Sequence, residues 1–331
     1  MRTIKHIAIA AIAIAVFGLI TSLSGPAIAQ SNPARPITII VPFPAGGGSD
    51  GLARIMADHM KGTLGKPVII ENVTGASGSI GVARAVRAPA DGQTISFGQW
   101  ASHVGAGAIY PVQYDVLRDL EPVALLGENP LWIVARPSLP ATNFKDMLAW
   151  LKANPQKATA ATVGAGSGAH LCGIYLQNAT GTSFQFVPYR GGAPAMQDMV
   201  GGQVDFMCDN ASNSISLARA NKIRPMAIMS KTRWFAAPDV PTIEEAGGPA
   251  LSISFWHAFW VPKGTPKDVI ARLNGAVVAA LADPAVRKRM TEHGFEIPTR
   301  GQQTPEALFA HHKAEIDKWW PIIKAANIKG D

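Results

Sequence analysis

Short apolar segments alternate with amphipathic ones along most of the chain. The apolar segments are four to seven residues long and rich in β-branched side chains, which is typical of buried strands. They cover residues 38–43, 68–71, 94–97, 131–135, 159–163, 184–187, 204–208, 225–229 and 255–261. Between several of them lie patterns that predict helices, at residues 50–61, 80–87, 144–152, 168–179, 193–201 and 212–221. This alternation predicts an α/β fold with largely parallel sheets.

Two glycine-rich loops lie over a hundred residues apart in this pattern, at Phe43–Asp50 and Gly164–His170. Each follows a predicted strand and leads into a predicted helix. The first N–H groups of a helix have no intrahelical partner and lie at the positive end of its dipole, so they favour an anion. Two such loops predict a clamp that closes on one anion from two lobes.

The N-terminus has the features of a secretory signal peptide. Arg2 and Lys5 precede an apolar run of 14 residues, Ile7–Ile20, which is short for a bilayer span. The small residues Ala27 and Ala29 predict cleavage after Ala29 and therefore a periplasmic protein. No later apolar run is long enough to predict a membrane span.

Charge and cysteine content narrow the function further. Removing Arg2 and Lys5 with the leader lowers the formal charge from +7 to +5, and the remaining basic residues are scattered. This favours small anions slightly and predicts no nucleic-acid partner. Cys172 and Cys208 fall in one predicted lobe, and the sequence leaves open whether they form a disulfide or two buried thiols.

The sequence supports an enzymatic function less well than it supports the binding of an anion. Residues Gly46–Gly51 satisfy the G-x-G-x-x-G pattern of dinucleotide-binding loops, but Pro42 and Pro44 interrupt the turn and an exported chain meets little nicotinamide cofactor. Ser167 and His170 are one helical turn apart, but the G-x-S-x-G elbow of hydrolases is absent. The histidines show no metal-ligand spacing. We therefore predict no catalysis, no cofactor and no metal, with an exported hydrolase as a minor alternative.

Proline and cap residues mark three helix starts near the C-terminus, at Thr265-Pro266, Asp283-Pro284 and Thr304-Pro305. Pro321 is expected to kink or split the last helix, in which Trp319 and Trp320 are predicted to act as packing anchors.

Several longer motifs resemble the Bug family of periplasmic solute-binding proteins, which serve tripartite tricarboxylate transporters. The resemblance covers essentially the whole predicted mature chain. It is carried by Ile39–Asp50, Glu71–Gly81, Pro89–Gly92, Gly166–Leu171, Val187–Ala195, Gly201–Asp205, Pro238–Thr242 and Glu244–Gly247.

The resemblance implies a two-lobed Venus flytrap fold with one sheet per lobe and the ligand cleft between them. After the leader, residues 1–29, the first lobe is expected to hold residues 30–130 and 257–331, and the second residues 131–256. Chain crossings are expected near residues 128–134 and 253–260. The implied function is capture of a small organic carboxylate by a monomer and its delivery to the transporter's membrane subunits. A periplasmic sensor that presents the ligand to a signalling partner is the alternative.

The predicted ligand-binding residues come mainly from the two loops. Trp100, after the third strand, is proposed to stack on the ligand, with core packing as the alternative. Tyr189 is a candidate either to offer its hydroxyl to the ligand's far end or to brace the hinge, and Arg190 either to pair with a distal carboxylate or to lie in solvent. Asn210 follows a predicted strand, where it could contact the ligand or cap a turn. The full predicted set is Phe43, Ala45, Gly46, Gly47, Gly48, Ser49, Asp50, Trp100, Ser102, Ala165, Gly166, Ser167, Gly168, His170, Tyr189, Asp209 and Asn210.

Overall fold

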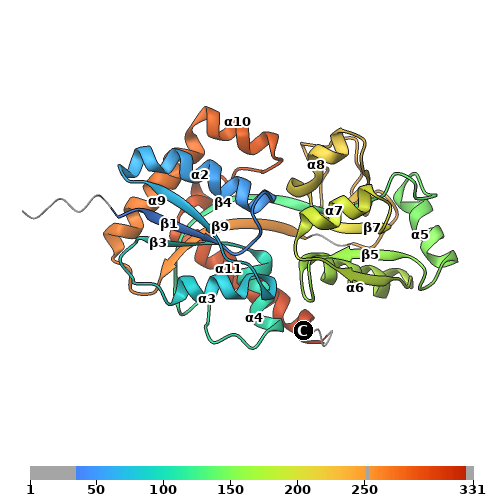
Figure 1. Ribbon diagram of the computed structural model, residues 1–331, viewed down its shortest axis with the longest axis horizontal. Coiled ribbons are helices and arrows are strands. Elements are labelled where there is room, and N and C mark those ends of the chain that lie inside the picture. The colour runs from blue at the N-terminus through green and yellow to red at the C-terminus, as the bar shows by residue number, and fades with distance from the viewer. Residues whose placement is uncertain (1–34, 251–252, 326–331) are drawn as a thin grey trace, which may run out of the picture. The chain divides into compact units, whose positions relative to one another are not determined.

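The computed structural model describes residues 35–250 and 253–325. The predicted leader and its cleavage site therefore lie outside the described residues. The chain alternates strands and helices as the sequence pattern predicts, and it forms two α/β lobes (Figure 1).

Lobe 1 is built on three parallel strands, with β1 between β2 and β3. Helices α2 and α3 connect these strands, and α9, α10 and α11 return to the same lobe from the C-terminal part of the chain (Figure 1). The bounds are β1 Ile37–Val41, α2 Gly48–Leu64, β2 Val68–Asn72, α3 Ser79–Val86, β3 Thr94–Gln99, α4 Ala106–Ile109, α9 Lys267–Ala282, α10 Pro284–Glu292 and α11 Pro305–Ala325.

Lobe 2 repeats this plan, with β5 between the parallel strands β6 and β7. Its strand β8 pairs with the crossing strand β4 instead. The bounds are α5 Phe144–Ala153, β5 Thr159–Thr162, α6 Gly168–Thr180, β6 Gln185–Pro188, α7 Gly192–Val200, β7 Phe206–Asn210, α8 Ala211–Arg219 and β8 Arg224–Ile228.

Two antiparallel strands run between the lobes, β4 (Leu120–Ala135) and β9 (Ser254–Pro262). β4 pairs with β9 as far as Pro130, and from Leu131 onward it pairs with β7 and β8. Each lobe therefore has a parallel core and antiparallel crossing strands, so the whole sheet is mixed. The predicted strand at 131–135 is only the last part of β4, because its first part contains Glu121, Pro122 and Glu128, which interrupt the apolar pattern.

Apolar side chains pack on both sides of the sheet in each lobe. In lobe 1, Ile39 and Phe97 of the sheet pack with Leu52 of α2 and Val277 of α9, and all four are fully buried. The helices of each lobe thus hold the strand ends in fixed positions, and the loops at those ends build the site.

Two of the three predicted cap residues, Asp283 and Thr304, cap the helix that follows them, and Thr265 does not. Asp283 caps α10, because its carboxylate accepts from Ala285 N and Val286 N, and Thr304 Oγ1 accepts from Ala307 N. Thr265 does not cap α9, because its hydroxyl donates to Pro262 O at 2.7 Å. Pro321 lies inside α11, which continues to Ala325.

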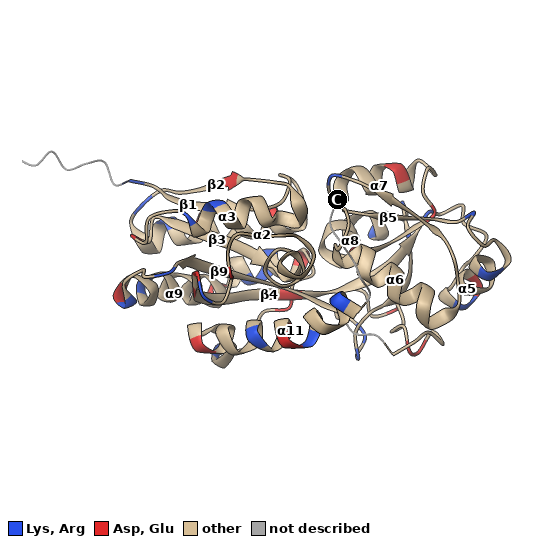
Figure 2. Ribbon diagram, turned by 90° about the horizontal axis from the view of Figure 1, so that it is seen from below, with Lys and Arg blue, Asp and Glu red and all other residues tan. Residues whose placement is uncertain are grey.

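Charged residues of both signs are interspersed over the two lobes (Figure 2). Within the described ranges, no single helix is long and apolar enough to cross a membrane. Only α9 with α10, bent by 74° at their junction, meets that length and composition test as a pair.

Candidate functional site

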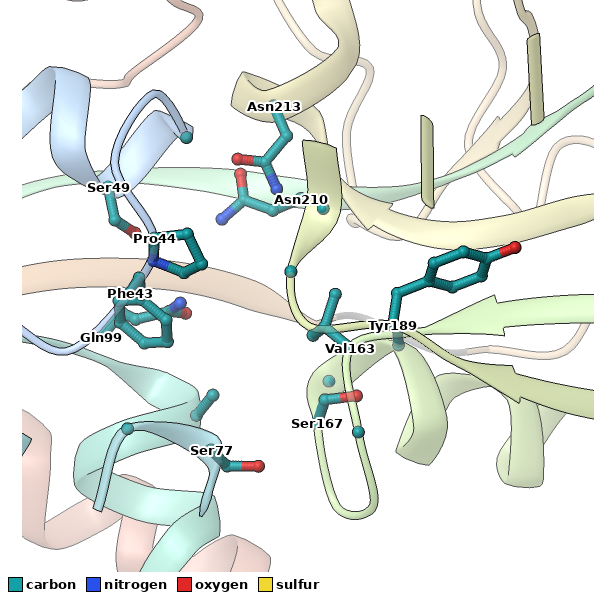
Figure 3. A pocket seen from close by; sticks show the side chains of 18 of the residues that line it. Phe43, Pro44, Ser49, Ser77, Gln99, Val163, Ser167, Tyr189, Asn210 and Asn213 are labelled. Carbon is teal, nitrogen blue, oxygen red and sulfur yellow. The ribbon is translucent and has the colours of Figure 1, made fainter. Parts of the chain in front are cut away.

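A cavity of about 530 Å³ lies where the strand ends of the two lobes face each other. Its walls come from the loop before α2, the loop before α3, the end of β3, and the loops before α6, α7 and α8 (Figure 3). The predicted residues that line it are Phe43, Ala45, Gly46, Gly47, Gly48, Ser49, Ser167, Gly168, Tyr189, Asp209 and Asn210. The structure thus brings the two glycine loops to one cavity.

The first loop presents backbone donors at the start of α2. Gly48 N donates to Asn213 Oδ1 at 2.9 Å, whereas Ser49 N and Gly47 N have no hydrogen-bond partner among the described residues. Both Gly47 and Ser49 line the cavity. Their N–H groups lie at the positive end of the helix dipole, so they suit an anion.

Asp50 belongs to this loop but supports it from behind rather than lining the cavity. Its carboxylate accepts from Gly46 N and Arg54 Nε at 2.9 Å and from Asn72 Nδ2 at 3.0 Å. Burial alone would raise the pKa of Asp50, but the hydrogen bonds from Arg54, Gly46 and Asn72 hold it below its usual value. Asp50 therefore stays ionised and fixes the loop's shape.

The second loop presents a matching pair of donors at the start of α6. Gly168 N and Ala169 N have no partner among the described residues, and both residues line the cavity. Ser167 caps the helix, because its hydroxyl accepts from His170 N at 3.3 Å.

Three predicted contacts in this loop, Ala165, Gly166 and His170, do not line the cavity. Gly166 N donates to His170 Nδ1 at 2.9 Å, so this donor is used within the loop. A Cβ atom on Gly166 would lie 2.1 Å from Ile109 Cδ1, which shows that the loop packs tightly on lobe 1. These residues shape the loop and do not face a ligand.

The two lobes contact each other on both sides of the cavity. On one side, the Asn213 side chain bridges the lobes by accepting from Gly48 N and donating to Asp209 Oδ1 at 3.1 Å. On the other side, Ala165 O accepts from Tyr110 Oη at 3.1 Å and from Ser77 Oγ at 3.3 Å. Asn213, Tyr110 and Ser77 therefore join the cavity walls across the gap.

The end of β7 places Asp209 and Asn210 in the wall of lobe 2. Burial raises the pKa of Asp209 to about 6, although hydrogen bonds from Ser214 and Asn213 oppose this rise. Asn210 Oδ1 accepts from Ser212 N at 3.1 Å and Ser212 Oγ at 2.8 Å, so it caps α8. Both side chains have structural partners as well as a place at the cavity.

Tyr189 lines the cavity through its ring, not its hydroxyl. The hydroxyl donates to Asp198 Oδ2 at 2.7 Å and points away from the cavity (Figure 3). Arg190 also lines the cavity, is exposed, and is the one cation among the lining residues.

Two predicted contacts from the end of β3, Trp100 and Ser102, lie outside the cavity wall, and for Trp100 the structure favours the alternative of core packing. Trp100 is 1% exposed, with its ring 5.2 Å from that of Trp319 and 5.9 Å from that of Phe255. Its backbone is already helical, because a helical turn at Ala101–Gly105 follows β3 directly. That turn directs Trp100 into the core, while Ser102 hydrogen-bonds to the backbone of Gln99.

Several cavity residues were not among the predicted contacts. They include Thr74, Gly75, Ala76, Ser77, Gly78, Gln99, Tyr110, Val163, Ala169, Gly191, Gly192, Ala193, Met207, Asn213 and Phe255. The glycine pair at residues 191–192 opens α7 and gave a sequence signal of the same kind as the two chosen loops. Gln99, Tyr110 and Asn213 gave none, because only the folded chain brings them to the cavity.

One arrangement resembles a catalytic pair. Ser49 Oγ lies 3.3 Å from His257 Nε2, but burial lowers the pKa of His257 to about 3, and its Nδ1 has no hydrogen-bond partner among the described residues. Activation of a serine requires a histidine that can take a proton and a group that orients it, and burial makes His257 a weaker base for this role. Within the described ranges, no three His, Cys, Asp or Glu residues are grouped as metal ligands.

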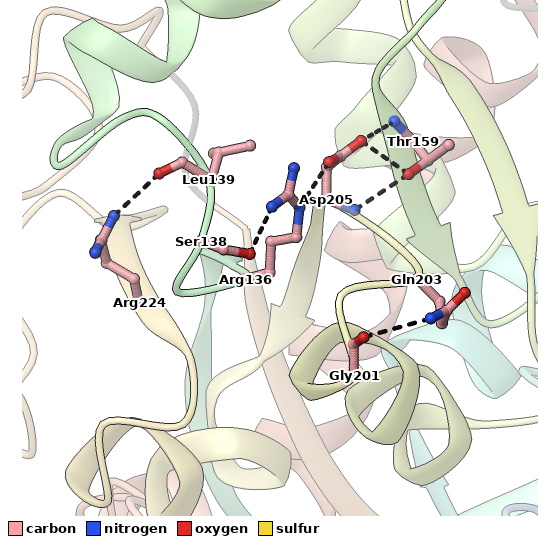
Figure 4. A network of polar contacts seen from close by, with 8 residues as sticks. All are labelled: Arg136, Ser138, Leu139, Thr159, Gly201, Gln203, Asp205 and Arg224. Atoms are coloured by element: carbon pink, nitrogen blue, oxygen red, sulfur yellow. Dashed lines mark hydrogen bonds and ion pairs between the residues drawn. The ribbon is translucent and has the colours of Figure 1, made fainter.

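Other chemistry-bearing residues in lobe 2 hold the fold together. Asp205 accepts from Arg136 Nε at 2.9 Å and from Thr159 N at 2.8 Å, so it joins β4, β5 and the start of β7 away from the cavity (Figure 4). Cys172 of α6 and Cys208 of β7 form a disulfide, which settles the alternative that the sequence left open.

Comparisons with known proteins agree with this geometry. Residues 52–328 match the family described as "Tripartite tricarboxylate transporter family receptor". Protein BugT of Bordetella pertussis is 34% identical over 321 residues, which cover 96% of this chain and 98% of BugT.

Two solved structures are also similar. The periplasmic binding protein BugD has a TM-score of 0.85 and 37% identity, covering 90% of this chain and 100% of that one. MatC from Rhodopseudomonas palustris, solved with bound malate, has a TM-score of 0.83 and 34% identity, covering 88% and 99%.

Proposed function

The chain belongs to the family of tripartite tricarboxylate transporter receptors, and on this premise we propose that it captures a small organic carboxylate between its lobes. We further propose that it works in the periplasm as a monomer, without a cofactor, and delivers the ligand to the membrane subunits of such a transporter.

The observation that carries this proposal is the pair of helix starts that face one cavity from opposite lobes. α2 offers Gly47 N and Ser49 N, and α6 offers Gly168 N and Ala169 N. Hydrogen bonds from N–H groups to an ionised carboxylate are stronger than those between neutral groups. One anion between the two loops would therefore hold the lobes together.

The rest of the cavity suits an organic acid rather than an inorganic anion. Phe43, Val163, Met207 and Phe255 supply apolar wall, and a cavity of about 530 Å³ leaves room for a carbon skeleton behind the carboxylate. Malate in the structure of MatC supports a carboxylate as the ligand class.

We place the hinge where β4 changes its pairing partner and where the chain enters β9. β4 exchanges β9 for β7 between Pro130 and Leu131, and Ile253 just before β9 bonds to Leu131 and Met229. Rotation about these two short segments would open the cavity without breaking either sheet. The lobe boundaries at residues 130 and 256 remain a proposal.

Calorimetry on the mature protein tests the ligand class. We expect the protein to bind at least one acid among succinate, malate and adipate, and to bind the matching diamide much more weakly because the amide carries no charge. Equal affinity for an acid and its diamide would refute the clamp.

A matched pair of variants tests the position of the anion. The backbone φ of Gly47 is −81°, and the atom nearest to an added Cβ is Pro44 O at 3.7 Å, so a side chain fits there. Gly47→Asp places a negative charge beside the expected carboxylate, and Gly47→Asn has the same shape without the charge. We expect the Asp variant to bind at least about tenfold more weakly than the Asn variant, or about 1.4 kcal/mol. Similar affinities would place the anion elsewhere.

A further inference from the structure

Gln99 ends β3 at the wall of the cavity, with its backbone held on both sides. Its N–H donates to Ser102 Oγ and its carbonyl accepts from the same hydroxyl, both at 3.2 Å. In the β3–β9 ladder it pairs with His257, whose ring contacts Ser49. The fold therefore fixes where the Gln99 side chain begins, directly beside the start of α2.

The Gln99 amide oxygen has no partner. The residue is 7% exposed and, like Phe43, lines the cavity from lobe 1 (Figure 3). Its Oε1 is buried without a hydrogen-bond partner among the described residues. Buried amides in folded proteins are nearly always hydrogen-bonded, because leaving them unpaired costs free energy. A ligand in the cavity can supply a partner for this amide.

Three other neutral polar side chains that line the cavity are already engaged. Asn213 bonds Gly48 and Asp209, Asn210 caps α8, and Tyr189 bonds Asp198. Among the buried side chains without a partner in the described ranges, Gln99 alone lines the cavity. Its amide is therefore a buried neutral group that a ligand can pair.

The surroundings of Gln99 determine which ligand group it suits. The neutral His257 is its partner in the ladder, and the one lining cation, Arg190, comes from lobe 2. A second carboxylate buried here would lack a positive partner and would be costly. A hydroxyl group both donates and accepts, so it can pair with either end of the amide.

We propose that Gln99 determines specificity by binding a hydroxyl group on the carboxylate ligand, so that the protein prefers hydroxy acids to their deoxy analogues. This inference rests on the proposed function and narrows it. A site in which a buried amide hydrogen-bonds a hydroxyl group of the ligand binds the analogue that lacks this hydroxyl much more weakly, because the amide is then left unpaired.

Calorimetry on the wild-type protein tests the preference with pairs that differ by one hydroxyl. The probes are each enantiomer of malate against succinate, and 2-hydroxyadipate against adipate. We expect the hydroxy acid to bind at least about tenfold more tightly in one pair or more. Equal or weaker binding of the hydroxy acid in every pair would overturn this inference alone. Binding of no acid at all would overturn the proposed function, and this inference with it.

Variants of Gln99 then test whether this residue is the source of the preference for hydroxy acids. Gln99→Leu removes both amide groups at similar size, and we expect it to reduce the preference to about twofold or less while the deoxy acid still binds. Gln93→Leu is the matched control, because Gln93 Oε1 is also buried without a partner but lies outside the cavity. A preference that survives in Gln99→Leu overturns the assignment. Gln99→Met serves the same comparison if the Leu variant does not fold.

Discussion

Gly48 is a single residue on which contact between the lobes depends. Its N–H bonds Asn213 of lobe 2, and a Cβ added to it would lie 2.2 Å from Ser212 Oγ and 3.1 Å from Ser212 Cβ. Ser212 cannot move freely, since its hydroxyl donates to Asn210 Oδ1. A glycine is needed at this position because the lobes meet there, not because of the helix that it begins.

Gly48→Ala is therefore expected to weaken carboxylate binding at least about tenfold, or about 1.4 kcal/mol, by keeping the lobes apart. Thermal unfolding without ligand should change much less. Gly51→Ala in the same helix is the control, because nothing lies within 4 Å of its added Cβ. It should bind normally and gain roughly 0.5–1 kcal/mol of stability. Titration of both variants with the same acid measures the difference, and equal affinities would contradict the proposed closure.

Trp100 shows that the position of a residue in the sequence does not by itself fix the direction of its side chain. Its place after β3 was predicted correctly, and carboxyl ends of strands do line the cavity. The chain enters a helical turn one residue later, which moves Gln99 and Ala101 to the cavity and Trp100 to the core. No composition or spacing rule distinguishes these three neighbours.

At the scale of elements, local hydrogen bonds decide which predicted cap residues bond to the helix that follows them. Asp283 caps α10 as its Asp-Pro pattern predicts, whereas Thr265 turns back to Pro262 and leaves α9 without a side-chain cap. Both patterns look alike in sequence. The Thr265 hydroxyl has a nearby carbonyl to which it donates, and a hydroxyl used in that turn does not cap the helix.

Asp283→Ala should lower the free energy of unfolding by about 1 kcal/mol through loss of this cap. Asp283→Asn keeps a side-chain oxygen for Ala285 N and Val286 N and should lose much less. Urea unfolding of the two variants provides the measurement. Ligand affinity should not change in either, because no residue of α10 lines the cavity. If the Asn variant is as unstable as the Ala variant, the charge of Asp283 matters and the cap does not.

At the scale of the whole described molecule, stability should depend on pH through buried histidines. Burial lowers the pKa of His257 to about 3 and of His312 to about 4, and the pKa of His103 also falls well below its usual 6.5. Below pH 6.5 the unfolded chain binds protons that the folded chain does not, so stability falls as the pH drops toward 4. Asp209, with its raised pKa, acts in the opposite direction below about pH 6.

Urea unfolding at pH 7.5 and pH 5.0 measures this dependence. We expect lower stability at pH 5.0, with a slope of up to about 1.4 kcal/mol per pH unit for each histidine. His312→Gln retains a donor for the His103 carbonyl, which His312 Nε2 contacts at 2.7 Å, but cannot be protonated. It should flatten the slope. A variant with the wild-type slope would show that this histidine is not a source of the pH dependence.

The sequence by itself determined the order of strands and helices, because apolar periodicity and glycine loops are local properties of the chain. It also predicted the two loops that face the cavity, since a glycine loop between a strand and a helix has the same geometry in any such fold. Tertiary structure alone decided the rest. The long crossing strand β4, the disulfide, the bridge from Gly48 to Asn213, and the unpaired amide of Gln99 all depend on which distant segments meet. Contacts between residues far apart in sequence are set by the packing of whole lobes, and no short stretch of chain encodes that packing.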